Sequence, residues 1–460
     1  MEIWIKVAQL VLSLSILVIL HELGHFVPAR LFKTRVEKFY LFFNPWFSLV
    51  KFKKGETEYG IGWLPLGGYV KIAGMIDESM DKEQMKQEPK PDEFRSKKAW
   101  QRLIIMIGGV TVNIILAVVI YIFMLWTWGE KYLPNQNVKD GISVDVLGKE
   151  LGLRNGDIVT KVDDDEVEDF FAISTSILLE NAKTITVNRN DSEKVLNVPE
   201  DYVKKMIDSK RSGMILPRMP MIIDSIPVGS INQSSLMKKG DRIIGFNNSY
   251  FSFHDEFNTL STDFVAQFNT LSFCQKFMNL NTEDKGHEVI VTAIRGNDVV
   301  KYPIIVNRRG KIEAMIVTDM DRFFGISTRE YSFFEAIPAG VKKMVSTVKN
   351  YWKQLGLIFN KKVRGYENVG GFMSIGNLFP GVWDWQSFWS LTAFLSIMLA
   401  ILNILPIPAL DGGHVLFLLI EIVSGRKPSE KVMEIAQYIG FFLLLALILY
   451  ANLNDVLKLF

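Results

Sequence analysis

Four long apolar stretches lie along the chain, and each is long enough to cross a bilayer as a helix, which takes roughly 20 apolar residues. They cover Ile3–Phe26, Leu103–Trp128, Phe388–Leu405 and Tyr438–Leu453. Tryptophan residues, whose rings prefer the lipid headgroup region, lie at or near the ends of two of these stretches. The pattern predicts a polytopic α-helical membrane protein with about four transmembrane helices.

The first apolar stretch is interpreted as a retained transmembrane helix and not as a cleaved signal peptide. A basic segment in front of it is nearly absent, and no small-residue cleavage site follows it. Instead, the helix-compatible sequence runs directly into His21-Glu22-Leu23-Gly24-His25.

The segment between the second and third stretches contains an internal repeat. The sequences from Leu151 and from Ser235 share a Gly-Asp pair, an apolar strand, a polar turn and a helix-like stretch. Each is followed by a hairpin pattern with period-2 alternation. This order resembles that of PDZ domains, so we expect two tandem external PDZ-like α/β domains. Two generic small α/β modules are the alternative.

Basic residues indicate the orientation of the predicted helices. The loop from Arg30 to Arg102 is rich in lysine and arginine, and the short loop before the last stretch adds Arg426, Lys427 and Lys431. Because such loops stay in the cytoplasm, both chain termini and the segment 129–387 are expected outside.

A further amphipathic helix is predicted from Tyr331 onward. Its apolar residues recur at helical spacing and lysines occupy much of the remainder. Such a helix is expected to lie on the outer membrane surface or to pack on the PDZ-like pair, and the pattern leaves both open.

Composition narrows the chemistry. The formal net charge is +2, and no nucleic-acid signature is present, so nucleic-acid partners are not expected. The single cysteine, Cys274, excludes an internal disulfide framework and any C-x-x-C metal site. A metal ion must therefore be bound by histidine and carboxylate, and the chain has five histidines.

The segment His21-Glu22-Leu23-Gly24-His25 carries the strongest chemical signal. On a helix, positions i and i+4 project from the same face, so two imidazoles can bind one Zn²⁺. The intervening Glu22 is then placed to act as a base on a water held by the metal. Two interfacial histidines reaching the headgroups are the alternative, but this leaves Glu22 unexplained. Ionisable side chains are costly in a membrane span and point to function.

A third ligand is expected at a similar membrane depth, because a catalytic zinc usually takes three protein ligands and keeps one open position. Asp411 follows the third span and supplies a carboxylate, while His414 is a rival ligand that we assign a structural or supporting role. Pro406 and Pro408 interrupt the helix before it. Asn403 offers an amide for the substrate backbone.

These motifs and their order resemble the site-2 protease family of intramembrane metalloproteases. The resemblance rests on HELGH in the first span, the distal NILPIPALDGGH from Asn403, and paired PDZ-like modules between the second and third spans. It covers essentially the whole chain. It implies that His21, His25 and Asp411 bind one Zn²⁺ per chain, that Glu22 is the catalytic base, and that Asn403 aligns the substrate.

Two other segments also resemble that family. Residues Trp63–Gly74 look like its membrane-associated β-hairpin on the cytoplasmic side, whose edge is thought to pair with an unwound substrate; an ordinary cytoplasmic hairpin is the alternative. The expected substrate-binding residues are Gly67, Gly68, Tyr69, Val70, Lys71, Asn113 and Asn403. Val110 and Phe372 stand where relatives usually carry proline, which bears on local helix geometry and substrate preference.

The sequence thus predicts seven segments. They are 1–30 with the first helix and HELGH, 31–101 with the hairpin, 102–130 with the second helix, 131–215 and 216–310 with PDZ-like domains, 311–386 with the amphipathic helix, and 387–460 with the last two helices and LDGG.

The expected activity is zinc-dependent cleavage of transmembrane segments of single-span proteins after a first external cut. Anti-sigma factors and signal-peptide remnants are both candidate substrates, and the PDZ-like domains are expected to exclude untrimmed substrates or to bind peptide C-termini. A bacterial inner membrane is expected, with a plastid membrane as alternative. A non-enzymatic membrane scaffold and a metal transporter are the competing hypotheses. Intact HELGH and LDG disfavour the first, and the glutamate between the histidines disfavours the second.

Overall fold

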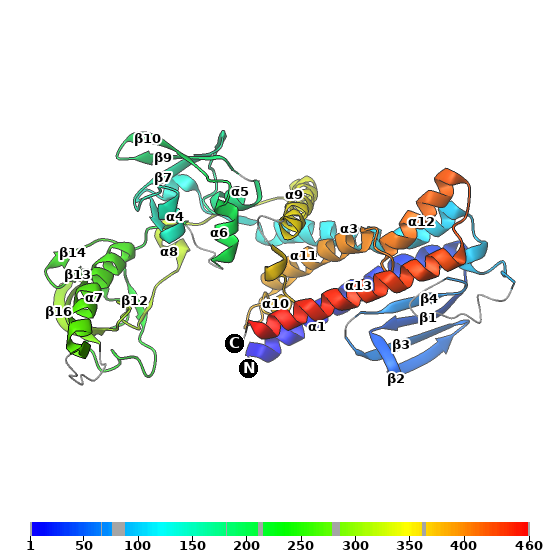
Figure 1. The fold of residues 1–460 in the computed structure, drawn as a ribbon, viewed down its shortest axis with the longest axis horizontal. Helices are drawn as coiled ribbons and strands as arrows, with labels where there is room; N and C mark the ends of the chain where they lie inside the picture. The colour runs from blue at the N-terminus through cyan, green and yellow to red at the C-terminus, as the bar shows by residue number, and fades with distance from the viewer. Residues whose placement is uncertain are drawn as a thin grey trace. The chain divides into compact units, whose positions relative to one another are not determined.

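The computed structural model describes residues 2–65, 67–75, 88–180, 182–209, 215–277, 286–360 and 365–458. The chain folds as two compact units (Figure 1). One unit, called here the membrane unit, combines Met1–Glu130 with Arg329–Phe460. The other, called the inserted unit, is Lys131–Thr328. The chain passes from one unit to the other at two short strands, β5 (Glu130–Tyr132) and β18 (Ser327–Arg329).

Among the described residues, four helices are long and apolar enough to cross a bilayer, all in the membrane unit, which confirms the predicted number. They are α1 (Glu2–Leu31), α3 (Ala99–Trp128), α11 (Trp385–Ile404) and α13 (Glu430–Leu457). Most extend past the apolar stretches by a few residues. Polar side chains at a helix end can reach the headgroups, so the helix does not have to stop where the apolar run stops.

Glycine permits a very close approach of α1 to α3. A Cβ atom on Gly24 would lie 2.4 Å from the carbonyl oxygen of Gly108, and one on Gly108 would lie 1.9 Å from that of Gly24. Small residues at such a crossing let two backbones pack directly together. Helix α11 is hydrogen-bonded to both of these helices. Thr392 Oγ1 donates to Ser13 Oγ of α1 (3.0 Å), and Ser396 Oγ donates to the carbonyl oxygen of Asn113 of α3 (2.8 Å).

A four-stranded sheet follows α1. Its strands are β1 (Val36–Leu41), β2 (Phe43–Lys54), β3 (Thr57–Leu64) and β4 (Tyr69–Ile72), in the spatial order β2-β3-β1-β4. The prediction of a hairpin over Trp63–Gly74 is wrong in its pairing. Strands β3 and β4 do not pair with each other, because β1 lies between them, parallel to β3 and antiparallel to β4. The local hairpin of this sheet is instead β2–β3.

Three α-helices in the described part of the membrane unit lie outside the four spans. The amphipathic helix α9 (Phe333–Phe359) packs its inner face on α3 and α11, with Gly340 against Ile122 of α3. The helix α12 (Asp411–Ser424) was not predicted separately. It begins after the predicted interruption at Pro406 and Pro408, and α11 ends at Ile404, as those prolines require. The short α10 (Phe372–Gly376) precedes α11.

The inserted unit contains the repeat as two similar modules. Each has a four-stranded antiparallel sheet with the same order, β10-β9-β7-β8 in the first and β16-β15-β13-β14 in the second. The first comprises β6 (Ile142–Val144), α4 (Val146–Glu150), β7 (Ile158–Val162), β8 (Asp165–Glu166), α5 (Ala172–Glu180), β9 (Thr184–Arg189), β10 (Ser192–Asn197), α6 (Tyr202–Asp208) and β11 (Ile215–Pro217). The second comprises β12 (Ile223–Ser225), β13 (Arg242–Phe246), β14 (Ser249–Tyr250), α7 (His254–Phe277), β15 (His287–Arg295), β16 (Asp298–Val306) and β17 (Met315–Ile316), and α8 (Met320–Phe324) follows it.

An ion pair with a buried aspartate recurs at the same place in both modules. Arg189 donates two 2.7 Å hydrogen bonds to Asp157 and one to the carbonyl oxygen of Gly152. Arg295 makes the same three bonds, at 2.7 Å each, to Asp241 and to the carbonyl oxygen of Leu236. These aspartates belong to the two Gly-Asp pairs by which the repeat was recognised. The sequence repeat therefore corresponds to a repeat in the three-dimensional structure.

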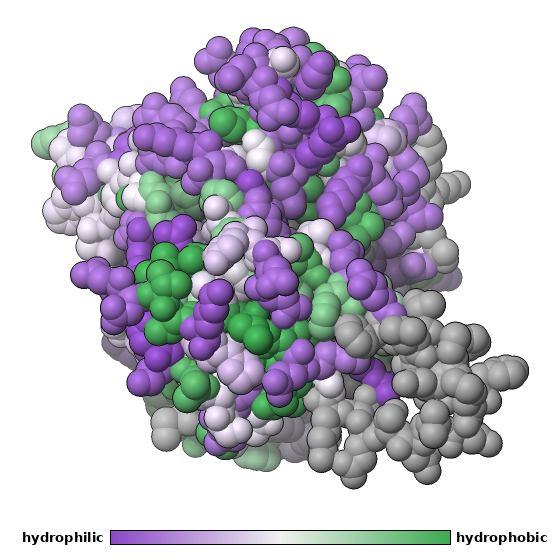
Figure 2. All heavy atoms as spheres, turned by 90° about the vertical axis from the view of Figure 1, so that its left-hand side faces the viewer, coloured by the Kyte–Doolittle hydropathy of each residue, from purple (hydrophilic) through white to green (hydrophobic). Residues whose placement is uncertain are grey.

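The cores of the modules extend beyond the predicted boundary at residue 310. Ile312 is buried in the second core, Ile316 packs against it, and Phe324 is buried in the first. The face of the inserted unit seen in Figure 2 is mainly hydrophilic, with hydrophobic groups in limited patches, as expected for a surface in water. The exposed side chains of α13, by contrast, are mostly large and apolar.

The Arg295–Asp241 pair makes a testable prediction about acid stability. Burial acts to raise the pKa of Asp241, but hydrogen bonds from Arg295 and Tyr302 outweigh it and hold this pKa below its ordinary value. The pair therefore stabilises the fold fully above the unfolded pKa of about 3.9, and this stability is lost as pH falls through the lower folded pKa. We expect Arg295→Met to destabilise the second module at neutral pH, because it leaves the buried Asp241 carboxylate without its charged partner, and to weaken this acid dependence.

Native-state hydrogen exchange of peptides from β13 and β15 in the intact protein measures both effects. Arg189→Met is the matched control, because it should act on β7 and β9 and leave β13 and β15 unchanged. Equal protection of β13 in wild type and Arg295→Met would contradict the prediction.

Candidate metal centre and active site

Two imidazoles of α1 lie next to each other inside the membrane unit. His21 and His25 are one helical turn apart, and only 7% and 5% of their surfaces are exposed. Their Nε2 atoms are 3.3 Å apart. The i, i+4 spacing thus places both rings on one face of the helix, as predicted.

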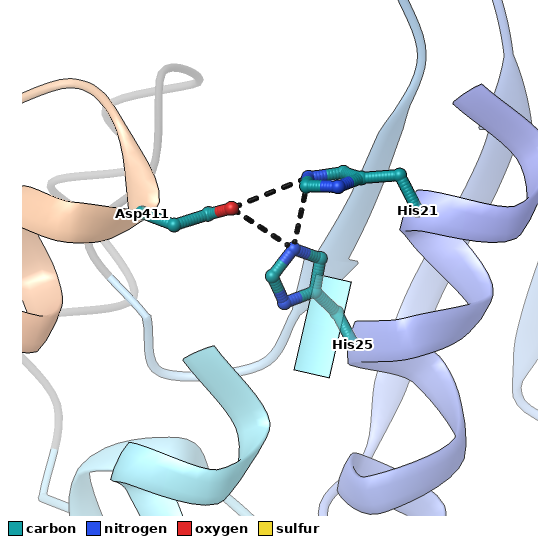
Figure 3. A group of neighbouring side chains, drawn as sticks. All are labelled: His21, His25 and Asp411. Carbon is teal, nitrogen blue, oxygen red and sulfur yellow. Dashed lines mark hydrogen bonds and ion pairs between the residues drawn. The ribbon is translucent and has the colours of Figure 1, made fainter. Parts of the chain in front are cut away.

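Asp411, the first residue of α12, meets these rings from the far end of the sequence (Figure 3). Its Oδ2 lies 3.2 Å from Nε2 of His21 and 3.3 Å from Nε2 of His25. The turn before it is constrained: Ala409 has a φ of +77°, which an L residue rarely adopts, and its N–H donates to Oε1 of Gln437 on α13. Gln437 therefore helps to hold the turn that presents Asp411.

The triangle of ligand atoms fits a tetrahedral zinc ion. An ion held at about 2.0–2.1 Å by each ligand keeps the ligand atoms roughly 3.3 Å apart. The three distances here are 3.2, 3.3 and 3.3 Å. In the described part of the chain, these three residues form the group of His, Cys, Asp or Glu side chains suited to hold a metal ion.

The second nitrogen of each imidazole also has a partner, which determines which nitrogen faces the ion position. Nδ1 of His25 lies 2.8 Å from the carbonyl oxygen of Ile105 and donates its proton there. This leaves a lone pair on Nε2, which would repel the Asp411 carboxylate unless a cation lay between them.

His21 is oriented by Asn113 of α3. Nδ1 of His21 is 3.1 Å from Nδ2 of Asn113, while Oδ1 of Asn113 is buried with no hydrogen-bond partner among the described residues. Exchanging the oxygen and nitrogen of this amide places Oδ1 next to Nδ1 of His21. Oδ1 then accepts the Nδ1 proton of His21, and Nε2 is left free as a ligand.

Gly109 of α3 provides the space that the two rings occupy. A Cβ atom there would lie 2.4 Å from Nε2 of His25 and 2.7 Å from Cε1 of His21. No side chain larger than hydrogen is compatible with this arrangement.

Glu22 faces a cavity of about 670 Å³ together with the three candidate ligands. Its carboxylate accepts a hydrogen bond from the backbone N–H of Val70 in β4. Gly68 permits this approach, because a Cβ atom on it would lie 2.6 Å from Cγ1 of Val18 on α1. The edge strand β4 therefore forms one wall of the cavity, and α12 with Gln437 forms another.

The remaining predicted residues fall into two groups. Gly68, Tyr69 and Val70 line the cavity, and so does His414. Gly67, Lys71, Asn113 and Asn403 are not among the lining residues. Asn113 is 0% exposed behind His21, a position that suits orientation of the ring and not contact with substrate. Nδ2 of Asn403 lies 3.3 Å from Nε2 of His21, and Lys71 pairs with Glu37.

Several functional positions were not predicted. Gly109 and the carbonyl oxygen of Ile105 act through the backbone of α3, and Gln437 acts from the last span. The short element Gly109-Val-Thr-Val-Asn113 did point to this part of α3, but the sequence does not show that it faces the imidazoles.

The centre lies well inside the helices that carry it. His21 is ten residues before the end of α1, and Gly109 is ten residues after the start of α3. At 1.5 Å per residue, both are about 15 Å from those helix ends. The centre therefore lies within the length of both helices and not at these ends.

Four apolar spans around a two-histidine, one-aspartate cluster with an adjacent glutamate define the class of membrane metalloproteases. The chain belongs to peptidase family M50, which it matches over residues 9–447. It is similar to the regulator of sigma-E protease RseP of Escherichia coli K12, with 28% identity over 98% of each chain. It is also similar to the regulator of sigma E protease of Haemophilus influenzae (25%, 99% of each chain) and to the protease RseP of Yersinia pestis (26%, 100% of each chain).

Other relatives carry the words zinc metalloprotease in their names, and the family uses zinc. The protein is accordingly a zinc metalloprotease of the membrane. This confirms the enzyme class, the cofactor and the family expected from the sequence.

The space at Gly109 gives a prediction for metal binding. Gly109→Ala should displace one or both imidazoles and lower zinc affinity by at least roughly 100-fold, the upper range for disturbing groups around a metal site. Competition with a fluorescent zinc chelator measures this directly. Gly356→Ala on α9 is the control, because nothing lies within 4 Å of a Cβ atom there. Retention of wild-type zinc affinity by Gly109→Ala would show that the rings do not occupy this space.

Proposed function

We propose that the protein is an intramembrane endoprotease that cuts transmembrane segments of single-span membrane proteins. The observation that supports this most strongly is the 3.2–3.3 Å triangle of His21, His25 and Asp411 beside Glu22, at a depth of about 15 Å within the spans.

In this proposal His21, His25 and Asp411 hold one Zn²⁺. Bound there, the ion would supply Lewis-acid chemistry to the scissile carbonyl group and to the attacking water. Glu22 takes the proton of the attacking water and delivers it to the leaving nitrogen. The hydrogen bond from Val70 keeps the carboxylate turned towards the cavity. Asn403, whose amide ends next to His21, aligns the substrate backbone near the reacting atoms.

Substrate binding is proposed at the outer edge of β4. A helix satisfies its own amide groups, so a transmembrane substrate must unwind before its peptide bond can be attacked. Strand β4 is the outermost strand of its sheet and lines the cavity. Its edge can pair with the unwound backbone, with the segment Gly67–Lys71 as the template.

The sheet is proposed to be associated with the membrane surface through the β2–β3 hairpin. Trp46 is 91% exposed, and the exposed side chains that follow are apolar or basic. These include Phe47, Leu49, Val50, Lys51, Phe52, Lys53 and Lys54. Apolar and aromatic groups of this kind are poorly placed in water, whereas an anionic membrane surface accommodates both types.

The proposed location is a bacterial inner membrane, with the basic loops in the cytoplasm. Both chain termini and the inserted unit then lie in the periplasm. The active site, being nearer to the Arg30 end of α1, opens towards the cytoplasm, from which water enters. Since relatives are named regulators of sigma-E, an anti-sigma factor is a candidate substrate, and signal-peptide remnants are another.

The two modules of the inserted unit are proposed to be PDZ-like domains that act as a size gate. They would exclude substrates whose external domain has not been trimmed by an earlier cut, and they would also bind new peptide C-termini. A rigid pair suits such a gate. Arg218, between the modules, bonds to Asp255 (2.9 Å) and Glu256 (2.7 Å) at the start of α7, and its own N–H donates to the carbonyl oxygen of Gly141.

Substitution of Glu22 tests the catalytic role. Purified Glu22→Gln should retain about one zinc per chain and cut a model transmembrane peptide at least roughly 1,000-fold more slowly than wild type, as for loss of a general base. Asp411→Asn should lose zinc. A Glu22→Gln variant that cleaves at the wild-type rate would refute the assigned base, and a zinc-free wild type without cleavage would favour the scaffold hypothesis.

Removal of the inserted unit tests the gate. A chain in which a short flexible linker replaces residues 131–328 should cut full-length and pre-trimmed substrates at similar rates, whereas the intact chain should cut the trimmed form faster. Cleavage of the trimmed substrate by both proteins is the internal control for activity. Continued rejection of the full-length substrate after deletion would exclude the gate.

A further inference from the structure

Apolar side chains make up most of the helix that carries Asp411. In α12, Leu416, Leu419, Ile420, Ile422 and Val423 are exposed on the outer side. Its inner side packs through Leu418, which is buried among Ile105 and Met106 of α3. Apolar packing of this kind allows sliding and rotation inside a membrane, because lipid chains are as apolar as the side chains they replace.

A buried ion pair fixes the other end of this helix. Glu421, in the last turn of α12, accepts a hydrogen bond from Arg102 of α3 at 2.5 Å. The side chains are 17% and 8% exposed. Nε of Arg102 also donates to the carbonyl oxygen of Lys97, so the guanidinium is held from two sides.

The position of Glu421 is unfavourable without this partner. The C-terminal end of a helix carries a partial negative charge, and a carboxylate there is repelled. The side chain is also largely removed from water, which penalises an unpaired charge. Glu421 therefore depends on Arg102, and the pair gives α12 a defined height and rotation against α3.

The same part of α3 serves the imidazole side of the centre. The carbonyl oxygen of Ile105 accepts the proton of His25, and Gly109 provides space for both rings. Arg102 is about one helical turn from Ile105. The two histidines and the aspartate come from opposite ends of the sequence. One short stretch of α3, from Arg102 to Gly109, thus contacts the histidines and also the helix that carries the aspartate.

We propose that Arg102 and Glu421 are positioning residues that set Asp411 against His21 and His25. Asp411 and Glu421 are ten positions apart on one continuous helix, about 15 Å at 1.5 Å per residue. A helix of this length moves as a rigid rod, so release at Glu421 shifts Asp411. The inference rests on the proposed function, because it assumes that Asp411 is a metal ligand.

The experiment compares metal binding by purified full-length variants in lipid nanodiscs. Glu421→Gln removes the charge at nearly constant shape, and we expect zinc affinity to fall about tenfold, within the range for groups that orient metal ligands. Bound Co²⁺ should show altered visible absorption, since these bands depend on ligand geometry. For a transmembrane peptide, kcat should fall while KM stays near its wild-type value. Exchanging the charges, with Arg102→Glu and Glu421→Arg together, should restore much of the zinc affinity.

Two variants keep the test interpretable. Lys343→Met removes the ion pair between Lys343 of α9 and Glu130, which follows the C-terminal end of α3. This variant should leave zinc affinity unchanged. Glu421→Asp keeps the charge on a shorter side chain. It should fold even if Glu421→Gln does not, and its zinc affinity should lie between that of wild type and that of a variant without the ion pair.

The outcomes separate the two proposals. If Glu421→Gln and Glu421→Asp bind zinc and Co²⁺ as wild type does, the pair has no positioning role, even if the thermal stability falls. If Asp411→Asn binds zinc as tightly as wild type, the ligand set itself is wrong and both proposals fail. Loss of zinc in Asp411→Asn with partial loss in Glu421→Gln supports both.

Discussion

The contact between α1 and α3 is the constraint on which the centre depends. Gly24 and Gly108 let the two backbones touch, and Gly109 leaves room for the rings of His21 and His25. Only at this separation can the Ile105 carbonyl oxygen and the Asn113 amide reach the far nitrogen of each ring. Hydrogen bonds to these nitrogens leave the Nε2 atoms free to bind a metal ion. The close packing of α1 on α3 is therefore what orients the two imidazoles as metal ligands.

Polar groups at this depth are expensive unless each has a partner, and the structure supplies partners in a consistent way. The buried hydroxyls of Ser13, Thr392 and Ser396 bond to each other or to backbone carbonyl oxygens. Arg102 and Glu421 neutralise each other. Asp411 has two imidazoles as neighbours, and a divalent cation among the three atoms would compensate its charge where a neutral imidazole cannot. The electrostatics of the cluster thus favour the metal that the family uses.

The features predicted correctly are those encoded over short distances. Helical spacing alone places His21 and His25 on one face, and hydropathy alone marks the four spans. Their pairing with Asp411 was predicted from a second motif, since spacing cannot connect residues so far apart. The distances between Asp411 and the two imidazoles agree with this pairing.

The features that were missed depend on long-range pairing. The hairpin prediction for Trp63–Gly74 was wrong because a turn-like Pro-Leu-Gly-Gly sequence does not reveal that β1 inserts between the flanking strands. Helix α12 was not predicted because its apolar run is too short to span a bilayer. Arg102 and Glu421 are 319 positions apart, and neither belongs to a recognisable motif.

The sheet explains how an enzyme of this kind can reach a peptide bond that a helix protects. Unwinding exposes amide groups, and each unpaired group in an apolar medium costs several kcal/mol. In the proposed function, the outermost strand β4 beside the cavity offers replacement hydrogen bonds as the substrate helix opens. Gly68 brings β4 so close to α1 that Val70 bonds to Glu22 itself. A backbone paired with β4 would consequently lie beside the proposed base and the metal ligands, so the same contact that stabilises the unwound segment also delivers it to the reacting groups.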